Sequence, residues 1–142
     1  MGMGFFRQKA ERLIAAARAL VEGHGGNLER MFEGATTEGI RGELLSWRGV
    51  GPETAGVVLL YAANRLVFPI DLYTTRLVER LGLGGGGYAE PQRLFTSQLP
   101  VDIDLYKEFH TLIDELGKRS CGAKPRCDRC ALRDLCRTAS SA

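Results

Sequence analysis

Apolar residues recur at intervals of three and four along most of this 142-residue chain. That interval is the period of an α-helix with one apolar face. The clearest helical stretches run from Ala10 to Val21, from Ala55 to Ala62, from Tyr73 to Leu81 and from Leu105 to Leu116. No segment alternates apolar and polar residues as a half-buried strand does. The pattern therefore predicts an all-α fold.

Polar residues and glycines indicate where these helices begin and end. Aspartate, asparagine or threonine directly before an apolar run acts as an N-cap, because its side chain accepts a backbone N–H of the first turn. Asp71 is one such residue, and Gly82 is expected to end the helix that Asp71 begins. The other candidate caps are Asn27, Thr36 or Thr37, and Asp102 or Asp104.

Residues 44–55 predict two helices joined by a tight turn with the sequence Gly49-Val50-Gly51. Glycine supplies the backbone freedom of such a turn, and Pro52 suits the first turn of the second helix. The unpaired backbone N–H groups of a glycine turn and a helix N-terminus can bind a phosphate without reading any base. Taken alone, however, a Gly-Val-Gly turn more often simply joins two packed helices.

The four cysteines of the chain are Cys121, Cys127, Cys130 and Cys136, with the spacing C-x5-C-x2-C-x5-C. Clustered thiols in a cytosolic chain are metal ligands rather than disulfide partners. Zinc and a [4Fe–4S] cluster are each bound by four cysteines, and the spacing alone does not distinguish the two.

The net charge of +2 is unevenly distributed. Residues 118–137 hold seven basic and two acidic side chains, a local charge of +5, so the rest of the chain carries −3. Charge concentrated in this way is typical of a surface that binds a polyanion, although a solvated face is the simpler interpretation.

The composition, 44% hydrophobic and 25% charged, suits a globular protein of one domain or of two small lobes sharing a core. No apolar run is long enough to span a bilayer, and the N-terminus lacks the pattern of a signal peptide. We therefore expect a cytoplasmic protein without a membrane partner.

In combination these motifs resemble a known family. Gly49 to Ala55 (GVGPETA), Pro69 to Arg76 (PIDLYTTR) and the four spaced cysteines are similar to the helix-hairpin-helix superfamily of DNA base-excision glycosylases, the endonuclease III family. The resemblance runs from about Gly4 to Cys136. It implies a glycosylase-like helical bundle that lacks the family's N-terminal helices, with the hairpin at about residues 40–63.

The resemblance also implies how the chain is divided. A partial helical lobe with the hairpin would occupy residues 1–66, and a second lobe with the catalytic aspartate and a C-terminal cluster loop, residues 121–136, would occupy 67–142. The family binds a [4Fe–4S] cluster on C-x6-C-x2-C-x5-C, from which this chain departs by one residue in the first loop. The resemblance favours a [4Fe–4S] cluster on Cys121, Cys127, Cys130 and Cys136, with zinc as the alternative.

The family also implies roles for other residues. Asp71 occupies the position of the family's catalytic aspartate, although by itself an aspartate before an apolar run is usually only a helix cap. Contacts with double-stranded DNA are expected from two groups, the hairpin and the basic loop. These residues are Arg48, Gly49, Val50, Gly51, Thr54, Lys124, Arg126 and Arg129.

Glu53 stands where strand-nicking members of the family carry a lysine that forms a Schiff base. The resemblance therefore implies a monofunctional DNA glycosylase, associated with the nucleoid, that removes a damaged base, such as an alkylated purine, or a mismatched one. One alternative is a non-catalytic iron–sulfur module that binds DNA, or an inactive fragment. Another is an iron–sulfur protein that binds no DNA. The surface left by the missing helices predicts self-association or a partner.

Overall fold

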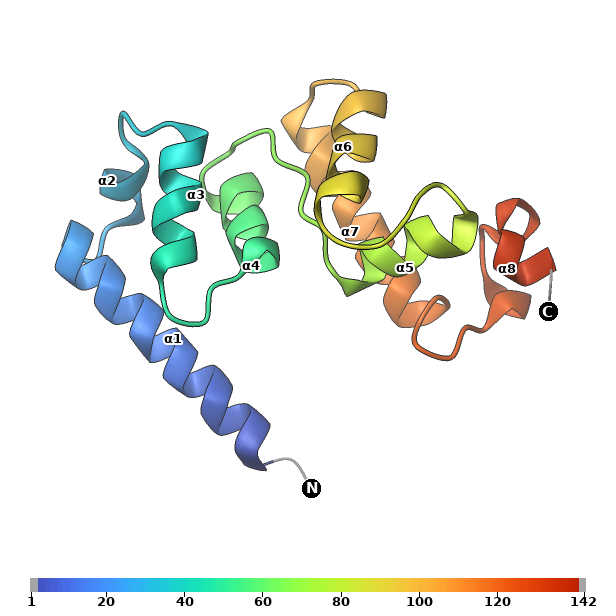
Figure 1. Ribbon diagram of the computed structural model, residues 1–142, viewed down its shortest axis with the longest axis horizontal. Helices are drawn as coiled ribbons and strands as arrows, with labels where there is room; N and C mark the ends of the chain where they lie inside the picture. Colours follow the sequence, from blue (N-terminus) through green and yellow to red (C-terminus); the bar gives the residue numbers. More distant parts are fainter. Residues whose placement is uncertain (1–2, 141–142) are drawn as a thin grey trace.

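A computed structural model describes residues 3–140 of the chain, and this part is helical with no strand (Figure 1). The prediction of an all-α fold is therefore confirmed. In chain order the elements are α1 (Met3–His24), α2 (Leu28–Phe32), α3 (Thr37–Ser46), α4 (Pro52–Val57), the π-helical segment η1 (Val58–Ala62), α5 (Leu72–Leu81), α6 (Ala89–Gln98), α7 (Ile103–Arg119), the 3-10 turns η2 (Cys127–Arg129) and η3 (Arg133–Leu135), and α8 (Arg137–Ser140). Within residues 3–140 no helix is long and apolar enough to cross a membrane.

The helices begin at the polar residues that the sequence indicates. Asn27 Oδ1 accepts the backbone N–H of Glu29 at 2.7 Å. Where the sequence left two choices, Thr36 caps α3 and Asp102 caps α7, each through backbone N–H groups of the first turn. Gly82 ends α5 in the left-handed conformation, at φ +72°.

Two groups of buried apolar side chains hold the helices together. The first joins α2, α3, α4 and η1 through Met31, Ile40, Leu44, Ala55 and Leu59. The second lies among α5, α6 and α7, where the rings of Phe68 and Phe95 stack at a centroid distance of 4.3 Å; its other fully buried members are Leu60, Ile70, Leu77, Val78, Tyr106 and Ile113. Figure 1 shows α1 to α4 at one end of the molecule and α5 to α8 at the other. The division of the chain at residue 66 stays a prediction.

Helix α1 forms as the apolar pattern predicts, but much of its apolar face is not covered. Leu13, Ile14 and Val21 are 72%, 52% and 60% exposed, whereas Leu20 packs against the first core group. Figure 1 shows the N-terminal part of α1 projecting away from the other helices. An exposed apolar face of this kind is where another protein surface can bind. It is consistent with self-association or a partner, which stays a prediction.

Helices α5 and α7 approach each other closely at Gly117. A Cβ atom built at Gly117 would lie 2.2 Å from Cδ1 and 2.8 Å from Cβ of Tyr73 on α5. Contacts that short are not possible, so α7 could accept a larger residue there only by moving away from α5. Gly117 therefore sets the distance between the helix that Asp71 begins and the helix that faces it.

We expect Gly117→Ala to lower the free energy of unfolding by about 2 kcal/mol, because overpacking costs more than the alanine gains as a helix former. Gly42→Ala is the matched control, since Gly42 lies inside α3 and a Cβ built there meets nothing within 4 Å. That variant should be slightly more stable than the parent. Urea unfolding followed by circular dichroism measures both, and equal midpoints would contradict the packing argument.

Candidate active site and nucleic-acid interface

The turn between α3 and α4 has the geometry of an open, glycine-based hairpin. Gly49 has φ +87°, a conformation that other residues rarely adopt. Gly51 is the N-cap of α4 and has no side chain to pair with the first-turn amides, and Pro52 follows it as predicted. Arg48, Gly49 and Thr54 are exposed; Val50 and Gly51 are half-buried. The hairpin thus leaves helix N-terminal amides uncapped, although its role in binding DNA stays a prediction.

Sequence reasoning did not find a further basic residue beside this turn. The aliphatic stem of Arg12, from α1, lies against Gly49 so closely that a Cβ built there would be 2.3 Å from Arg12 Cγ. Arg12 and Arg48 are both exposed, so a basic side chain from α1 and one from the turn itself lie at the hairpin. Only a tertiary contact brings them together, since 36 positions separate the two residues in the chain.

Asp71 lies where α5 begins, with its side chain only 13% exposed. Its Oδ1 atom accepts the backbone N–H of Thr74 at 2.7 Å, and Thr75 Oγ1 donates to its backbone carbonyl at 2.9 Å. The predicted cap is therefore present. A helix N-terminus stabilises a negative charge, so the same position suits a fixed carboxylate.

The second oxygen of Asp71 faces a histidine that sequence reasoning missed. His110, on α7, is 8% exposed, and its Nε2 atom lies 3.9 Å from Asp71 Oδ2. Its other nitrogen, Nδ1, lies 3.0 Å from the hydroxyl oxygen of Tyr61 on η1. Burial lowers the pKa of His110, while the charges of Asp71 and Asp114 oppose that shift more weakly.

Glu53, in the first turn of α4, also lies within electrostatic reach of Asp71. Partial burial raises the pKa of Glu53, and the negative charge of Asp71 raises it further. This coupling links the hairpin, through its second helix, to the aspartate at the start of α5. Glu53 and Asp71 thus lie near enough for their charges to interact, although 18 positions separate them in the chain.

The four cysteines are free thiols, half-buried, in the loop and turns after α7. All four line one small cavity, together with Arg80, Ser120, Pro125, Thr138 and Ala139. No group of three or more side chains in residues 3–140 is arranged to hold a single metal ion as it stands. Thiols gathered on the wall of one cavity nevertheless have the donor chemistry that an iron–sulfur cluster requires.

Arg80, in the last turn of α5, fastens the loop that carries these cysteines. Its guanidinium donates to the Cys121 carbonyl at 2.9 Å and to Cys121 Sγ at 3.1 Å, and also to the carbonyls of Gly122 and Ala123. In return, the carbonyl of Arg80 accepts from Cys136 Sγ at 3.5 Å. One arginine therefore contacts both ends of the four-cysteine segment.

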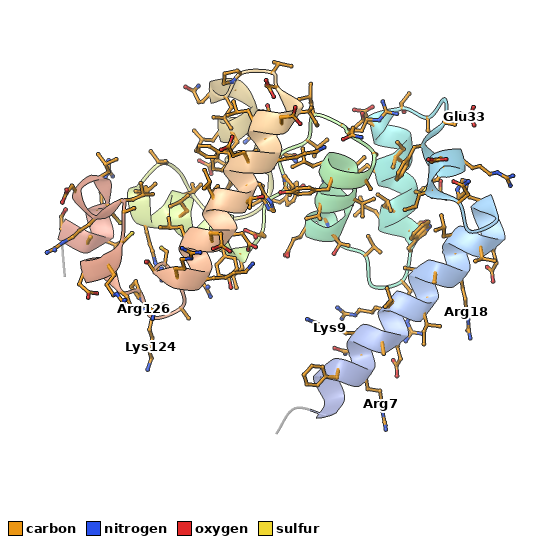
Figure 2. All side chains as sticks on the ribbon, turned by 180° about the vertical axis from the view of Figure 1, so that it is seen from behind. Arg7, Lys9, Arg18, Glu33, Lys124 and Arg126 are labelled. Carbon is orange, nitrogen blue, oxygen red and sulfur yellow. The ribbon has the colours of Figure 1, made fainter. Side chains whose placement is uncertain are left out.

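The basic residues of this loop point to solvent. Figure 2 shows Lys124 and Arg126 projecting from its tip, and Arg7, Lys9 and Arg18 projecting from α1 at the other end of the molecule. Arg126 donates to the carbonyl of Arg119, which holds the loop against the end of α7. The loop and the hairpin are thus separate basic regions, with α5 and α7 between them.

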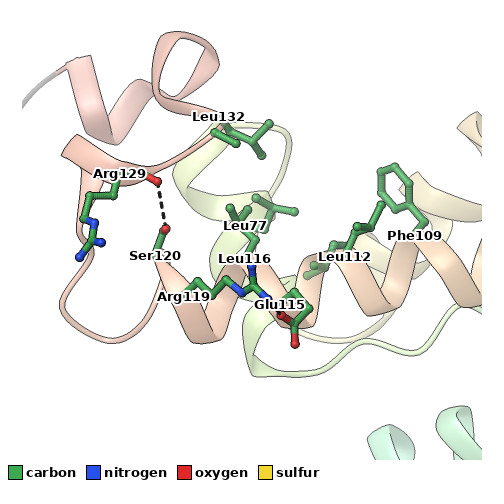
Figure 3. A pocket seen from close by; sticks show the side chains of 11 residues that line it. Leu77, Phe109, Leu112, Glu115, Leu116, Arg119, Ser120, Arg129 and Leu132 are labelled. Carbon is green, nitrogen blue, oxygen red and sulfur yellow. Dashed lines mark hydrogen bonds and ion pairs between the residues drawn. The ribbon is translucent and has the colours of Figure 1, made fainter.

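Arg129 lies instead on the wall of an apolar pocket of about 480 Å³ (Figure 3). Its backbone carbonyl accepts the hydroxyl of Ser120 at 3.3 Å. The apolar part of the wall comes from Leu77 on α5, from Phe109, Leu112, Ile113 and Leu116 on α7, and from Ala131 and Leu132. Arg129 is exposed, as Lys124 and Arg126 are, and its predicted contact with DNA stays a prediction.

Sequence comparison relates the chain to DNA repair proteins. A protein of Methanocaldococcus jannaschii with the provisional name of a DNA repair glycosylase is 41% identical over 135 residues, which are 94% of this chain and 61% of the relative. Endonuclease III of Thermotoga maritima is 32% identical over 135 residues, covering 94% of this chain and 58% of the relative. The chain thus spans about three-fifths of the length of these curated relatives. No family model matches it.

Solved structures share the fold. A trapped covalent intermediate of endonuclease III with DNA matches with a TM-score of 0.75 at 24% identity, covering 98% of this chain and 62% of the other. The 3-methyladenine DNA glycosylase of H. pylori, bound to 1,N6-ethenoadenine, matches with a TM-score of 0.69 at 27% identity, covering 82% and 58%.

The fold and the glycine hairpin define an all-α protein of the helix-hairpin-helix class. Its relatives in sequence are endonuclease III and a related DNA repair glycosylase, which confirms the resemblance found in the sequence.

Proposed function

We propose that this chain is a DNA N-glycosylase of base-excision repair, which hydrolyses the bond between a damaged or mismatched base and its sugar. The observation that carries the proposal is the environment of Asp71. Its carboxylate is mostly buried, one oxygen is fixed by the Thr74 amide, and the other faces His110. A group that served only as a cap would not need its second oxygen oriented within the protein.

Cleavage of an N-glycosidic bond develops positive charge on the sugar, as in an oxocarbenium ion. A carboxylate already held in place stabilises that charge without reorganising as the bond breaks. Asp71 would lie beside the sugar of a nucleotide rotated out of the duplex and would direct a water molecule to the anomeric carbon. The displaced base leaves with the electron pair of the broken bond and takes up a proton, while the water forms the new C–O bond and loses one.

Double-stranded DNA would be held at two regions. The uncapped amides at Gly51 and the start of α4, with Arg48 and Arg12 beside them, suit one phosphate group. Lys124 and Arg126 suit the backbone further along. These contacts carry no sequence information, and a repair enzyme that examines every site requires such contacts.

The four cysteines would bind a [4Fe–4S] cluster in the cavity that all of them line. The cluster would supply a rigid cross-link between loop segments that bury little apolar surface. Zinc remains the alternative, and elemental analysis with the visible absorption spectrum distinguishes the two metals. The family lysine is replaced by Glu53, whose carboxyl cannot form a Schiff base with the opened sugar. We therefore infer that the chain releases bases without nicking the strand.

The test uses duplexes that each contain one alkylated, deaminated or mismatched base, incubated with the purified chain. We expect base release from at least one of them, detected as strand breakage after hot alkali, and no covalent product on borohydride reduction. Salt-dependent duplex binding without release from any lesion would instead indicate a non-catalytic DNA-binding module. A borohydride-trapped product would contradict the assignment of a monofunctional enzyme.

A further inference from the structure

The environment of His110 carries an inference about how the carboxylate of Asp71 is held. Residues of three elements meet here: Asp71 at the start of α5, His110 on α7 and Tyr61 on η1. The Nε2 atom of His110 is buried and has no hydrogen-bond partner among the described residues. Leaving a buried polar atom without a partner is unfavourable, so its presence here needs an explanation.

The Asp71 carboxylate determines which nitrogen of His110 carries the proton. If the proton were on Nδ1, the lone pair of Nε2 would face the carboxylate oxygen 3.9 Å away, which is unfavourable. With the proton on Nε2, an N–H group faces the negative charge, which is favourable. The second arrangement also leaves Nδ1 as an acceptor, to which the neighbouring Tyr61 hydroxyl can donate.

The Tyr61 hydroxyl can supply the hydrogen bond that Nδ1 then accepts. Its oxygen lies 3.0 Å from His110 Nδ1, 3.1 Å from the Lys107 carbonyl and 3.2 Å from the Thr111 hydroxyl, so its one proton has more than one acceptor. The Lys107 carbonyl also accepts from the Thr111 hydroxyl at 2.8 Å, whereas an unprotonated Nδ1 has no other donor among the described residues. Donation from Tyr61 to Nδ1 therefore satisfies the acceptor that would otherwise stay unpaired, and it would fix the imidazole from the side opposite Asp71.

We propose that His110 is a positioning residue for Asp71: its neutral imidazole donates Nε2–H to Asp71 Oδ2 when the site is engaged, while Tyr61 donates to Nδ1. The Thr74 amide and His110 would then hold one carboxylate oxygen each, which fixes the plane of the carboxylate beside the sugar. The present separation of 3.9 Å is about 1 Å longer than a charge-assisted hydrogen bond, so the proposal requires this distance to shorten when DNA binds. Burial, which lowers the pKa of His110, keeps the imidazole neutral near pH 7.

Two further charged groups face this arrangement. Glu53 on α4 acts on Asp71, and Asp114 on α7 acts on His110. Both are negative, so neither can replace the donor that His110 supplies. The role of His110 in catalysis rests on the proposed glycosylase function, whereas the proton on Nε2 does not.

The first experiment is therefore independent of activity. Nitrogen-15 spectra of the histidine-labelled chain at pH 7 should show His110 with the proton on Nε2 and an accepting Nδ1. In Asp71→Asn the proton should move at least partly to Nδ1, because the charge that favours an N–H group on Nε2 is gone. A proton on Nδ1 in the parent chain would overturn the proposal, whatever the chain does to DNA.

The second experiment measures single-turnover base release and duplex affinity separately. His110→Phe keeps a ring of similar size and removes the donor; we expect the rate to fall roughly 100-fold, as for a misplaced catalytic group, with affinity unchanged. His110→Gln, whose amide can donate from nearly the same place, should recover most of the rate. Equal losses in the two variants, or a loss of affinity that matches the loss of rate, would overturn the proposal. Thermal unfolding of each variant checks that it is folded.

Discussion

Asp71→Asn is expected to lower the single-turnover rate of base release by roughly 1,000-fold, because it removes the charge that stabilises the developing cation. Asparagine caps a helix about as well as aspartate does. The Thr74 amide keeps its acceptor, so α5 and the fold should be retained. Affinity for an undamaged duplex should not fall, because the proposed phosphate contacts do not include Asp71. Rate and affinity are measured on the same preparation with the best lesion from the duplex panel.

Asp102→Asn is the matched control for that experiment. Asp102 caps α7 through two backbone N–H groups at 2.9 Å, so the same chemical change is made at the start of another helix. The control should release bases at the parental rate. If Asp71→Asn also kept the parental rate, Asp71 would be a cap only and the proposed mechanism would be wrong.

If the four cysteines bind the proposed cluster, Cys130→Ala is expected to abolish metal binding and to weaken duplex binding about tenfold or more, because the basic loop loses its shape. Neither η2, η3 nor α8 contains a buried residue, so little apolar packing is available to hold these turns together. The variant should lose the visible absorption of an iron–sulfur cluster. It should also become sensitive to proteolysis after Ser120, where α7 ends.

Ala131→Ser is the control for the cysteine variant, since Ala131 is exposed and directly follows Cys130. It should keep the metal, the affinity and the resistance to protease. If Cys130→Ala kept its metal content and its proteolytic pattern, the prediction would be contradicted. The thiol of Cys130 would then not be a metal ligand.

The parts of this structure that local chemistry determines could be predicted from the sequence. A cap such as Thr36 or Asp71 acts within three residues of itself, so its effect is visible in the neighbouring sequence. The hairpin is similar, because Gly49 and Pro52 each impose a backbone conformation. The helical period of the apolar residues predicts the helices, although it does not predict which element each apolar face packs against.

The parts that depend on contacts between distant helices could not be predicted. His110 lies on α7 among apolar residues, and nothing nearby in the sequence indicates that it faces a carboxylate 39 positions earlier. The same holds for two arginines. Arg12 lies against Gly49 and Arg80 donates to Cys121, and in each case the partner is remote in the chain. The apolar face of α1 was read correctly as helical, but periodicity predicts a face and not its neighbour.

Helix α5 has Asp71 at its first turn and Arg80 at its last, with about 15 Å of continuous backbone between them. Since Arg80 contacts both Cys121 and Cys136, a displacement of the cysteine loop would be passed along α5 to its first turn. If the chain acts as proposed, loss of order in that loop would therefore lower the rate of base release even though no cysteine lies beside Asp71.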